Sequence, residues 1–391
     1  MPNRGGLAAV RAGVASRRNS ATIARKINGR RTVSPGRNAM NLARRRLLQL
    51  AGATVAAPAV MRTAWGQTPQ VTLKLHHFLP PVSNAHGKLL VPWAKKVEAD
   101  SGNRIKIDVY PSMQLGGTQP QLYDQARDGV VDIVWTLPGS TAGRFPAIEV
   151  FELPFVAAKL AVPNAKAVQE FYETTPFLKE EFKEVHPICV WAHDGGLIHT
   201  NRAVRTMEDL RGLKLRSPTR LAGDALKALG ANGIPMPIPQ LPESLAQRVL
   251  DGCVIPWEVV PAVKVHELLK FHTDIPGSPT LYTATFIIAM NKAKYQSLAP
   301  DLQQAIDKNS GLVAAVMAGQ MWDDQAKVVE EMVRKRGNTV TSIAQDEKAR
   351  WVKATEPVVD AWLKQAKERG LDSGKLLDTA RSLVNKHAQQ T

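Results

Sequence analysis

The sequence is poor in cysteine, with only Cys189 and Cys253 among 391 residues. Two cysteines exclude a small domain held together by several disulfides, and this pair cannot form a Cys-x-x-Cys metal site. Both lie in apolar, strand-like runs, so we expect two buried free thiols. A bridge between them stays open as an alternative if the chain is exported to an oxidising compartment.

Catalytic and membrane-spanning signatures are also missing. The chain contains no G-x-S-x-G, no G-x-x-x-x-G-K-[ST] and no H-E-x-x-H, the patterns of serine hydrolases, P-loop NTPases and zinc proteases. After residue 67, no stretch reaches the eighteen apolar residues of a membrane-spanning helix. These absences disfavour an enzyme but do not exclude one.

Acidic side chains are absent from residues 1–66, whereas that segment holds thirteen basic residues. The whole chain has a formal net charge of +16, so the remainder carries 16 − 13 = +3. A nearly neutral body does not require a phosphate-binding surface, and we therefore expect no nucleic-acid partner.

Residues 40–66 have the order of a signal peptide. Arg44–Arg46 form a basic head, Leu47–Met61 an apolar run, and Ala64-Trp65-Gly66 supplies small residues before Gln67. The adjacent arginines partly match a twin-arginine export signal. For residues 1–39 two interpretations stay open: a wrongly assigned extension upstream of a true start at Met40, or a disordered basic arm.

The body alternates strand-like and helix-like segments. The period of the apolar residues and the Gly and Pro positions predict strands and helices in turn. The predicted strands are Val71–Phe78, Arg104–Tyr110, Val130–Thr136, Pro187–His193, Leu213–Leu215, Ile234–Ile238, Cys253–Ile255 and Leu281–Met290. The predicted helices are Gly87–Ser101, Gln119–Asp128, Asn164–Glu184, Thr219–Leu229 and Pro242–Leu250. This alternation predicts an α/β fold with largely parallel sheets.

Two such α/β series predict two lobes around a ligand cleft, joined by crossing strands near His193–Thr200 and Leu281–Ile287. We expect lobe 1 to hold 67–193 with part of 281–391, and lobe 2 to hold 194–280 with part of 338–391. Residues 299–391 are predicted to be mostly helical and to bridge both lobes, with a possible edge strand at Asn338–Ile343.

Four motifs carry a family resemblance. They are YPSMQLG at Tyr110–Gly116, FELPF at Phe151–Phe155, DLRGLKLRSP at Asp209–Pro218, and LDG at Leu250–Gly252 leading to Pro256-Trp257-Glu258. In this order, between about Leu73 and Arg369, they resemble the solute-binding proteins of tripartite ATP-independent periplasmic (TRAP) transporters, the dicarboxylate-binding-protein family.

The resemblance implies a two-lobed periplasmic receptor that captures a small organic acid and delivers it to TRAP membrane permease subunits. It implies no catalysis, no cofactor and no metal, and a monomer or weak dimer. Two alternatives stay open: a periplasmic hydrolase or lyase acting on an organic acid in the same cleft, and a sensory solute receptor.

The resemblance also implies site residues. Arg216 matches the family's carboxylate-pairing arginine, and a guanidinium fork fits a carboxylate in two parallel hydrogen bonds. Trp257 is expected to wall an aromatic ligand, and Glu258 to accept a ligand hydroxyl or contact a cation. From the first lobe we expect contributions near strand ends from Phe78, Gln119, Trp135 and Thr136.

One departure bears on the ligand. Family members that bind diacids carry a second arginine where this chain reads DGGLI at Asp194–Ile198. Arg144 and Arg220 are possible substitutes that the sequence does not place. Because an unpaired buried carboxylate is costly, we expect a small monocarboxylate, either a 2-oxo or a 2-hydroxy acid, and Trp257 favours an aromatic one.

Overall fold

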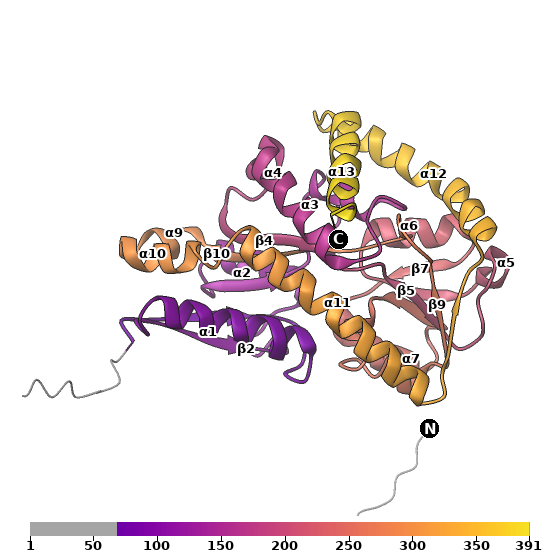
Figure 1. Ribbon diagram of the computed structural model, residues 1–391, viewed down its shortest axis with the longest axis horizontal. Coiled ribbons are helices and arrows are strands. Elements are labelled where there is room, and N and C mark those ends of the chain that lie inside the picture. Colours follow the sequence, from indigo (N-terminus) through magenta and orange to yellow (C-terminus); the bar gives the residue numbers. More distant parts are fainter. Residues whose placement is uncertain (1–68, 391) are drawn as a thin grey trace, which may run out of the picture. The chain divides into compact units, whose positions relative to one another are not determined.

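The structure is a computed structural model that describes residues 69–390. The predictions for 1–39 and 40–66 lie outside the described residues. Packing divides the chain after Thr63, and every described residue belongs to the second unit. Within that unit, the predicted α/β class is confirmed by two separate sheets covered by helices (Figure 1).

The first sheet has five strands in the order β2-β1-β3-β10-β4. They are β1 (Val71–His76), β2 (Ile105–Tyr110), β3 (Ile133–Thr136), β4 (Val185–Ala192) and β10 (Thr285–Asn291). The first three are parallel, as the alternation predicted, but β10 is antiparallel to both neighbours. Because β4 is in turn antiparallel to β10, four of the five strands run in the same direction and the expectation of a largely parallel sheet is confirmed on this side. The exception is β10, which enters from the other sheet.

The second sheet has six strands in the order β11-β9-β5-β8-β6-β7. They are β5 (Leu197–Thr200), β6 (Lys214–Ser217), β7 (Asn232–Pro235), β8 (Gly252–Ile255), β9 (Phe271–Asp274) and β11 (Thr339–Ser342). Here β5 runs antiparallel to β8 and β9. The predicted edge strand is β11, and it pairs only with β9.

Helices cover both sheets. They are α1 (Val91–Asp100), α2 (Leu122–Arg127), α3 (Ala161–Thr174), α4 (Pro176–Glu181), α5 (Met207–Leu210), α6 (Arg220–Ala228), α7 (Leu241–Ala246), α8 (Val265–Leu268), α9 (Lys292–Gln296), α10 (Pro300–Asp307), α11 (Leu312–Lys335), α12 (Gln345–Glu368) and α13 (Ser373–Ala388). The shorter helical turns are η1 (Ala85–Leu90), η2 (Gln119–Gln121), η3 (Pro138–Ser140), η4 (Ile148–Glu152), η5 (Ile238–Gln240) and η6 (Trp257–Val259).

Two features of the helices differ from or add to the predicted pattern. The segment expected as one helix at Asn164–Glu184 is broken between α3 and α4 at Pro176, which lacks an N–H and disfavours helical geometry in the residue before it. The long helix α11 contacts both β4 and η6 and so spans the two sheets, and α12 and α13 follow it (Figure 1). No helix of residues 69–390 is both long and apolar enough to cross a membrane.

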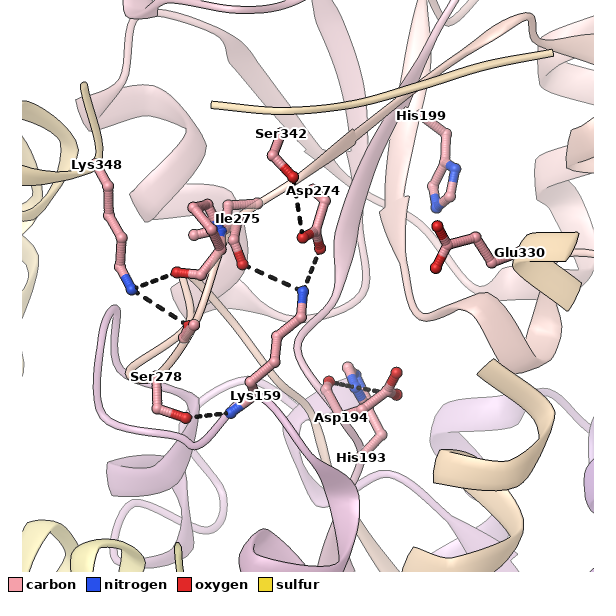
Figure 2. Close-up of polar contacts among 12 residues, drawn as sticks. Lys159, His193, Asp194, His199, Asp274, Ile275, Ser278, Glu330, Ser342 and Lys348 are labelled. Carbon is pink, nitrogen blue, oxygen red and sulfur yellow. Dashed lines mark hydrogen bonds and ion pairs between the residues drawn. The ribbon is translucent and has the colours of Figure 1, made fainter. Parts of the chain in front are cut away.

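The chain passes between the sheets three times, once through α11 and twice through shorter connections that pack on one another. Residues 193–196 link β4 to β5, and residues 275–284 link β9 to β10, with Gly196 N donating to Tyr282 O at 3.1 Å. Lys159 fastens both connections: its carbonyl accepts from Gly195 N, while its Nζ pairs with Asp274 and donates to Ile275 O at 3.1 Å (Figure 2). The first connection lies within the predicted His193–Thr200, whereas the second begins before the predicted Leu281–Ile287 and overlaps it at residues 281–284.

Candidate functional site

A narrow cavity lies where the two sheets and α11 meet. Its walls come from both sides of the two crossings. The lining residues are Phe78, Leu79, Gln119, Trp135, Leu137, His193, Arg216, Pro218, Ile238, Ile255, Pro256, Glu258, Val259, Tyr282, Ala284, Phe286 and Trp322.

Aromatic rings form one wall. Phe78, just after β1, stacks on Trp135 of β3 with ring centroids 4.7 Å apart. Trp135 also packs against Phe286 of β10 at 5.4 Å, and Phe286 against Trp322 of α11 at 5.4 Å. These rings are held by one another and by the sheet, so they offer a rigid apolar surface suited to an aromatic ring.

The lining contains one fully charged cation, Arg216. It lies on β6 and is 2% exposed, and its Nε donates to Met236 O at 2.7 Å. Within residues 69–390, no carboxylate lies within ion-pair distance of its guanidinium. Burial lowers the pKa of Arg216 from its ordinary value, but a guanidinium stays charged in proteins. A buried charge without a counter-charge is costly, and an anionic ligand supplies that counter-charge.

Two neutral groups stand beside this cation. Burial lowers the pKa of His193 to about 3, and its Nε2 accepts from Ala284 N at 2.9 Å while Nδ1 donates to Asp194 O (Figure 2). Burial also raises the pKa of Tyr282, whose ring packs edge-on against His193 with centroids 5.3 Å apart. Neither side chain adds charge, so the Arg216 end of the cavity matches one negative charge.

Glu258 brings a carboxyl group to the cavity from η6. It is 1% exposed, its Oε1 accepts from Ala85 N at 2.9 Å, and its backbone O accepts from Asn84 Nδ2 at 3.1 Å. Burial raises the pKa of Glu258 to about 7, against the opposing effects of the Ala85 N–H and of Lys88. Both hydrogen bonds join a turn that follows β8 to a segment that follows β1, so they tie the two sheets together.

Gln119 makes a further hydrogen bond that joins the two walls of the cavity. Its Oε1 accepts from Ile238 N, 3.3 Å away in η5, while its backbone O accepts from Thr136 Oγ1 at 3.5 Å. Thr118 begins the turn that holds Gln119 and makes a capping box with Gln121. With the Glu258 contacts, this bond holds the walls of the cavity together.

The structure gathers five of the seven predicted site residues around this cavity. Phe78, Gln119, Trp135, Arg216 and Glu258 line it.

Thr136 and Trp257 do not line the cavity. Thr136 is buried beside Gln119. Trp257 packs against His199 and His272, with centroids 5.4 Å from each. Successive side chains of a 3₁₀ turn point about 120° apart, so the turn that aims Glu258 at the cavity aims Trp257 away from it.

The two arginines considered as a second cation pair elsewhere. Arg144 contacts Asp124 at 2.8 Å and lies over the ring of Tyr123, and Arg220 contacts Glu149 at 2.7 Å. Neither lines the cavity. No group of three or more potential metal ligands gathers in the described part of the chain.

Among the lining residues with imidazole or aromatic side chains, sequence reasoning missed four: His193, Tyr282, Phe286 and Trp322. The first two lie in or beside the crossings, where the chain direction predicts a cleft but not which side chains face it. Phe286 lies in an apolar run that predicts a strand but not a cavity wall. Trp322 is on a helix whose alanine-rich face gave no sign that it reaches a cavity.

Comparisons with known proteins agree with this geometry. Residues 75–365 match the family described as bacterial extracellular solute-binding protein, family 7. A TRAP solute-binding protein from Rhodoferax ferrireducens, crystallised with copurified benzoate, is 44% identical, with a TM-score of 0.79 over 82% of this chain and 99% of that one.

Two further relatives differ in ligand. A marine metagenome TRAP protein specific for aromatic acid ligands, crystallised with 3-hydroxybenzoate, is 43% identical, with a TM-score of 0.79 over 82% of this chain and 99% of that one. The 2,3-diketo-L-gulonate-binding periplasmic protein of Escherichia coli is 28% identical over 245 residues, 61% of this chain and 72% of that protein.

Proposed function

Because the chain belongs to family 7 of the bacterial extracellular solute-binding proteins, we propose that it captures an aromatic monocarboxylate in the periplasm and delivers it to a TRAP-type membrane permease. The observation that carries the proposal is Arg216, a buried guanidinium without a carboxylate partner in a cavity walled by aromatic rings. The benzoate and 3-hydroxybenzoate bound by relatives with 44% and 43% identity support the same ligand class.

The lining favours one carboxylate rather than two. Arg216 can receive a carboxylate in two parallel hydrogen bonds. The stacked pair Phe78 and Trp135 would then cover the ligand ring. A second carboxylate on the ligand would meet no further charged cation, since the other titratable lining groups are His193, Tyr282 and Glu258.

In this proposal, capture of the ligand is coupled to closure of the two lobes. Lobe 1 comprises residues 67–193 with part of 281–391, and lobe 2 comprises residues 194–280 with part of 338–391. The bonds from Ala85 to Glu258 and from Ile238 to Gln119 would form as the walls meet. A ligand that touches both walls stabilises the closed state by its differential affinity for the two states. The permease would then distinguish the closed, loaded receptor from the open one.

The test is calorimetric titration of benzoate into the mature protein and into Arg216→Gln. Removing one partner of a buried charge pair should weaken binding by about 2–5 kcal/mol, roughly thirty- to several-thousandfold. Arg211→Gln is the matched control, because Arg211 is exposed in the turn before β6. Equal affinity in Arg216→Gln and the wild type, or conversion of benzoate to another compound, contradicts the proposal.

A further inference from the structure

One carboxyl oxygen of Glu258 has no hydrogen-bond partner among the contacts that join the cavity walls. Oε1 accepts from Ala85 N at 2.9 Å, whereas Oε2 accepts no hydrogen bond from residues 69–390. The residue is 1% exposed and lines the cavity. No lysine or arginine of the described chain lies within ion-pair distance of it; Lys88, in η1, instead donates to Gln325. A carboxyl oxygen that has no donor at a cavity wall can accept a hydrogen bond from the cavity's occupant.

This oxygen lies at a different part of the cavity from Arg216. The neighbours of Arg216 are Met236, Tyr282 and Cys253. Glu258 is instead set against Asn84 and Ala85, at the start of η1. The two neighbourhoods share no residue, and Lys88 rather than Arg216 is the cation that acts on the Glu258 carboxyl. A ligand whose carboxylate is on Arg216 therefore points its other end toward Glu258.

The surroundings of Glu258 determine which chemical group the ligand can carry at the end remote from its carboxylate. Glu258 and Asp323 both raise the pKa of the buried Asp194, after the larger effect of burial, so three acidic groups share this region. Lys159 acts on Asp194 in the opposite direction but is already paired with Asp274. A second ligand carboxylate would find no unpaired cation here, whereas a hydrogen-bond donor would find the unpartnered Oε2.

We propose that Glu258 is the specificity-determining residue of the site and selects aromatic monocarboxylates that carry a ring hydroxyl remote from the carboxylate. The hydroxyl donates to Oε2 while Oε1 holds the Ala85 N–H of the facing wall. The ring hydroxyl of the ligand and the Ala85 N–H thus bind the two oxygens of one carboxyl group. The preferred ligand therefore also orients the Glu258 side chain, whose bond to Ala85 joins the two walls of the cavity. This proposal rests on the proposed function and names the ligand subclass within it.

The test compares four probes by calorimetry: benzoate, 3-hydroxybenzoate, 4-hydroxybenzoate and the methyl ether of whichever hydroxybenzoate binds more tightly. In the wild type, that hydroxybenzoate should bind about 10- to 100-fold more tightly than benzoate, since a hydrogen bond to a buried charged group is among the stronger ones. Its methyl ether, which has no donor, should bind no better than benzoate. All titrations are repeated after dialysis against EDTA, because a bridging cation would also involve Glu258.

In Glu258→Gln, the amide oxygen can keep the Ala85 N–H and the amide NH₂ then faces the cavity in place of an acceptor. The preference for the hydroxyl over benzoate, both measured in this variant, should fall below about threefold. Glu267→Gln, an exposed change in α8, is the matched control and should keep the preference.

The outcomes separate the two proposals. Failure of all four probes to bind the wild type overturns the proposed function. Binding of benzoate with no preference for either hydroxybenzoate overturns only the role of Glu258, as does a preference that survives in Glu258→Gln or disappears on EDTA dialysis. If Glu258→Gln does not fold, the ranking of hydroxyl above methyl ether in the wild type still decides the matter.

Discussion

Gly196 provides a steric test of how the cavity wall is built. A methyl group at this position would lie 1.9 Å from Cε1 and 2.6 Å from Cζ of Tyr282. Ordinary contact begins near 3.4 Å, so the ring would have to move by about 1.5 Å, the difference between these distances. Tyr282 is buried against His193 and lines the cavity next to Arg216. Gly196→Ala therefore displaces a ring that lines the cavity.

We expect Gly196→Ala to lower stability by about 1–3 kcal/mol, as overpacking of a well-packed core does, and to weaken benzoate binding at least about tenfold. Thermal unfolding with and without benzoate, followed by calorimetry, measures both effects. Gly374→Ala is the control, since nothing lies within 4 Å of a methyl group there. Adding Tyr282→Ala to Gly196→Ala should restore part of the lost stability, a non-additive result. Wild-type stability and affinity in Gly196→Ala would refute this description of the wall.

Three further predictions follow from buried groups. Burial raises the pKa of Glu152 to about 7, above its value in the unfolded chain, so ionisation of this carboxyl destabilises the fold increasingly as pH rises toward 7. Glu152→Gln should therefore raise the melting temperature by roughly 3–6 °C at pH 8 and hardly at pH 4. Trp135→Leu should weaken benzoate binding at least about tenfold, whereas Trp257→Phe should change it less than about threefold by calorimetry, because only Trp135 lines the cavity; the reverse order would contradict the site. Cys189 and Cys253 are buried free thiols, so a thiol reagent should label neither in the native protein and both after unfolding without reductant.

The sequence predicted those parts of the fold that depend on local pattern. Alternating apolar residues placed β1 and β2 within a residue or two, and the glycine and proline positions bounded most helices. The strands β5 and β9 were not predicted. Each has only four residues, and β9, which reads FHTD, is too polar to show an apolar alternation. The antiparallel course of β10 depends on the path between the sheets, which no local pattern encodes.

The site was predictable where chemistry and motif coincide. Arg216 stands out because a cation at a strand end within the DLRGLKLRSP motif has a clear use. Trp257 was expected at the cavity because it follows the LDG motif, where the family presents a ligand-contacting side chain. The geometry of a three-residue turn nevertheless decides which of Trp257 and Glu258 faces inward. Phe286 and Trp322 come together from segments far apart in the chain, and only their packing makes them one wall.

The most direct test of the central claim is a crystal structure of the mature protein with bound benzoate. The account predicts both carboxylate oxygens at about 2.7–2.9 Å from the terminal nitrogens of Arg216, with the ring against Phe78 and Trp135. A benzoate carboxylate bound by other groups, with the Arg216 guanidinium contacting only Met236, would contradict it.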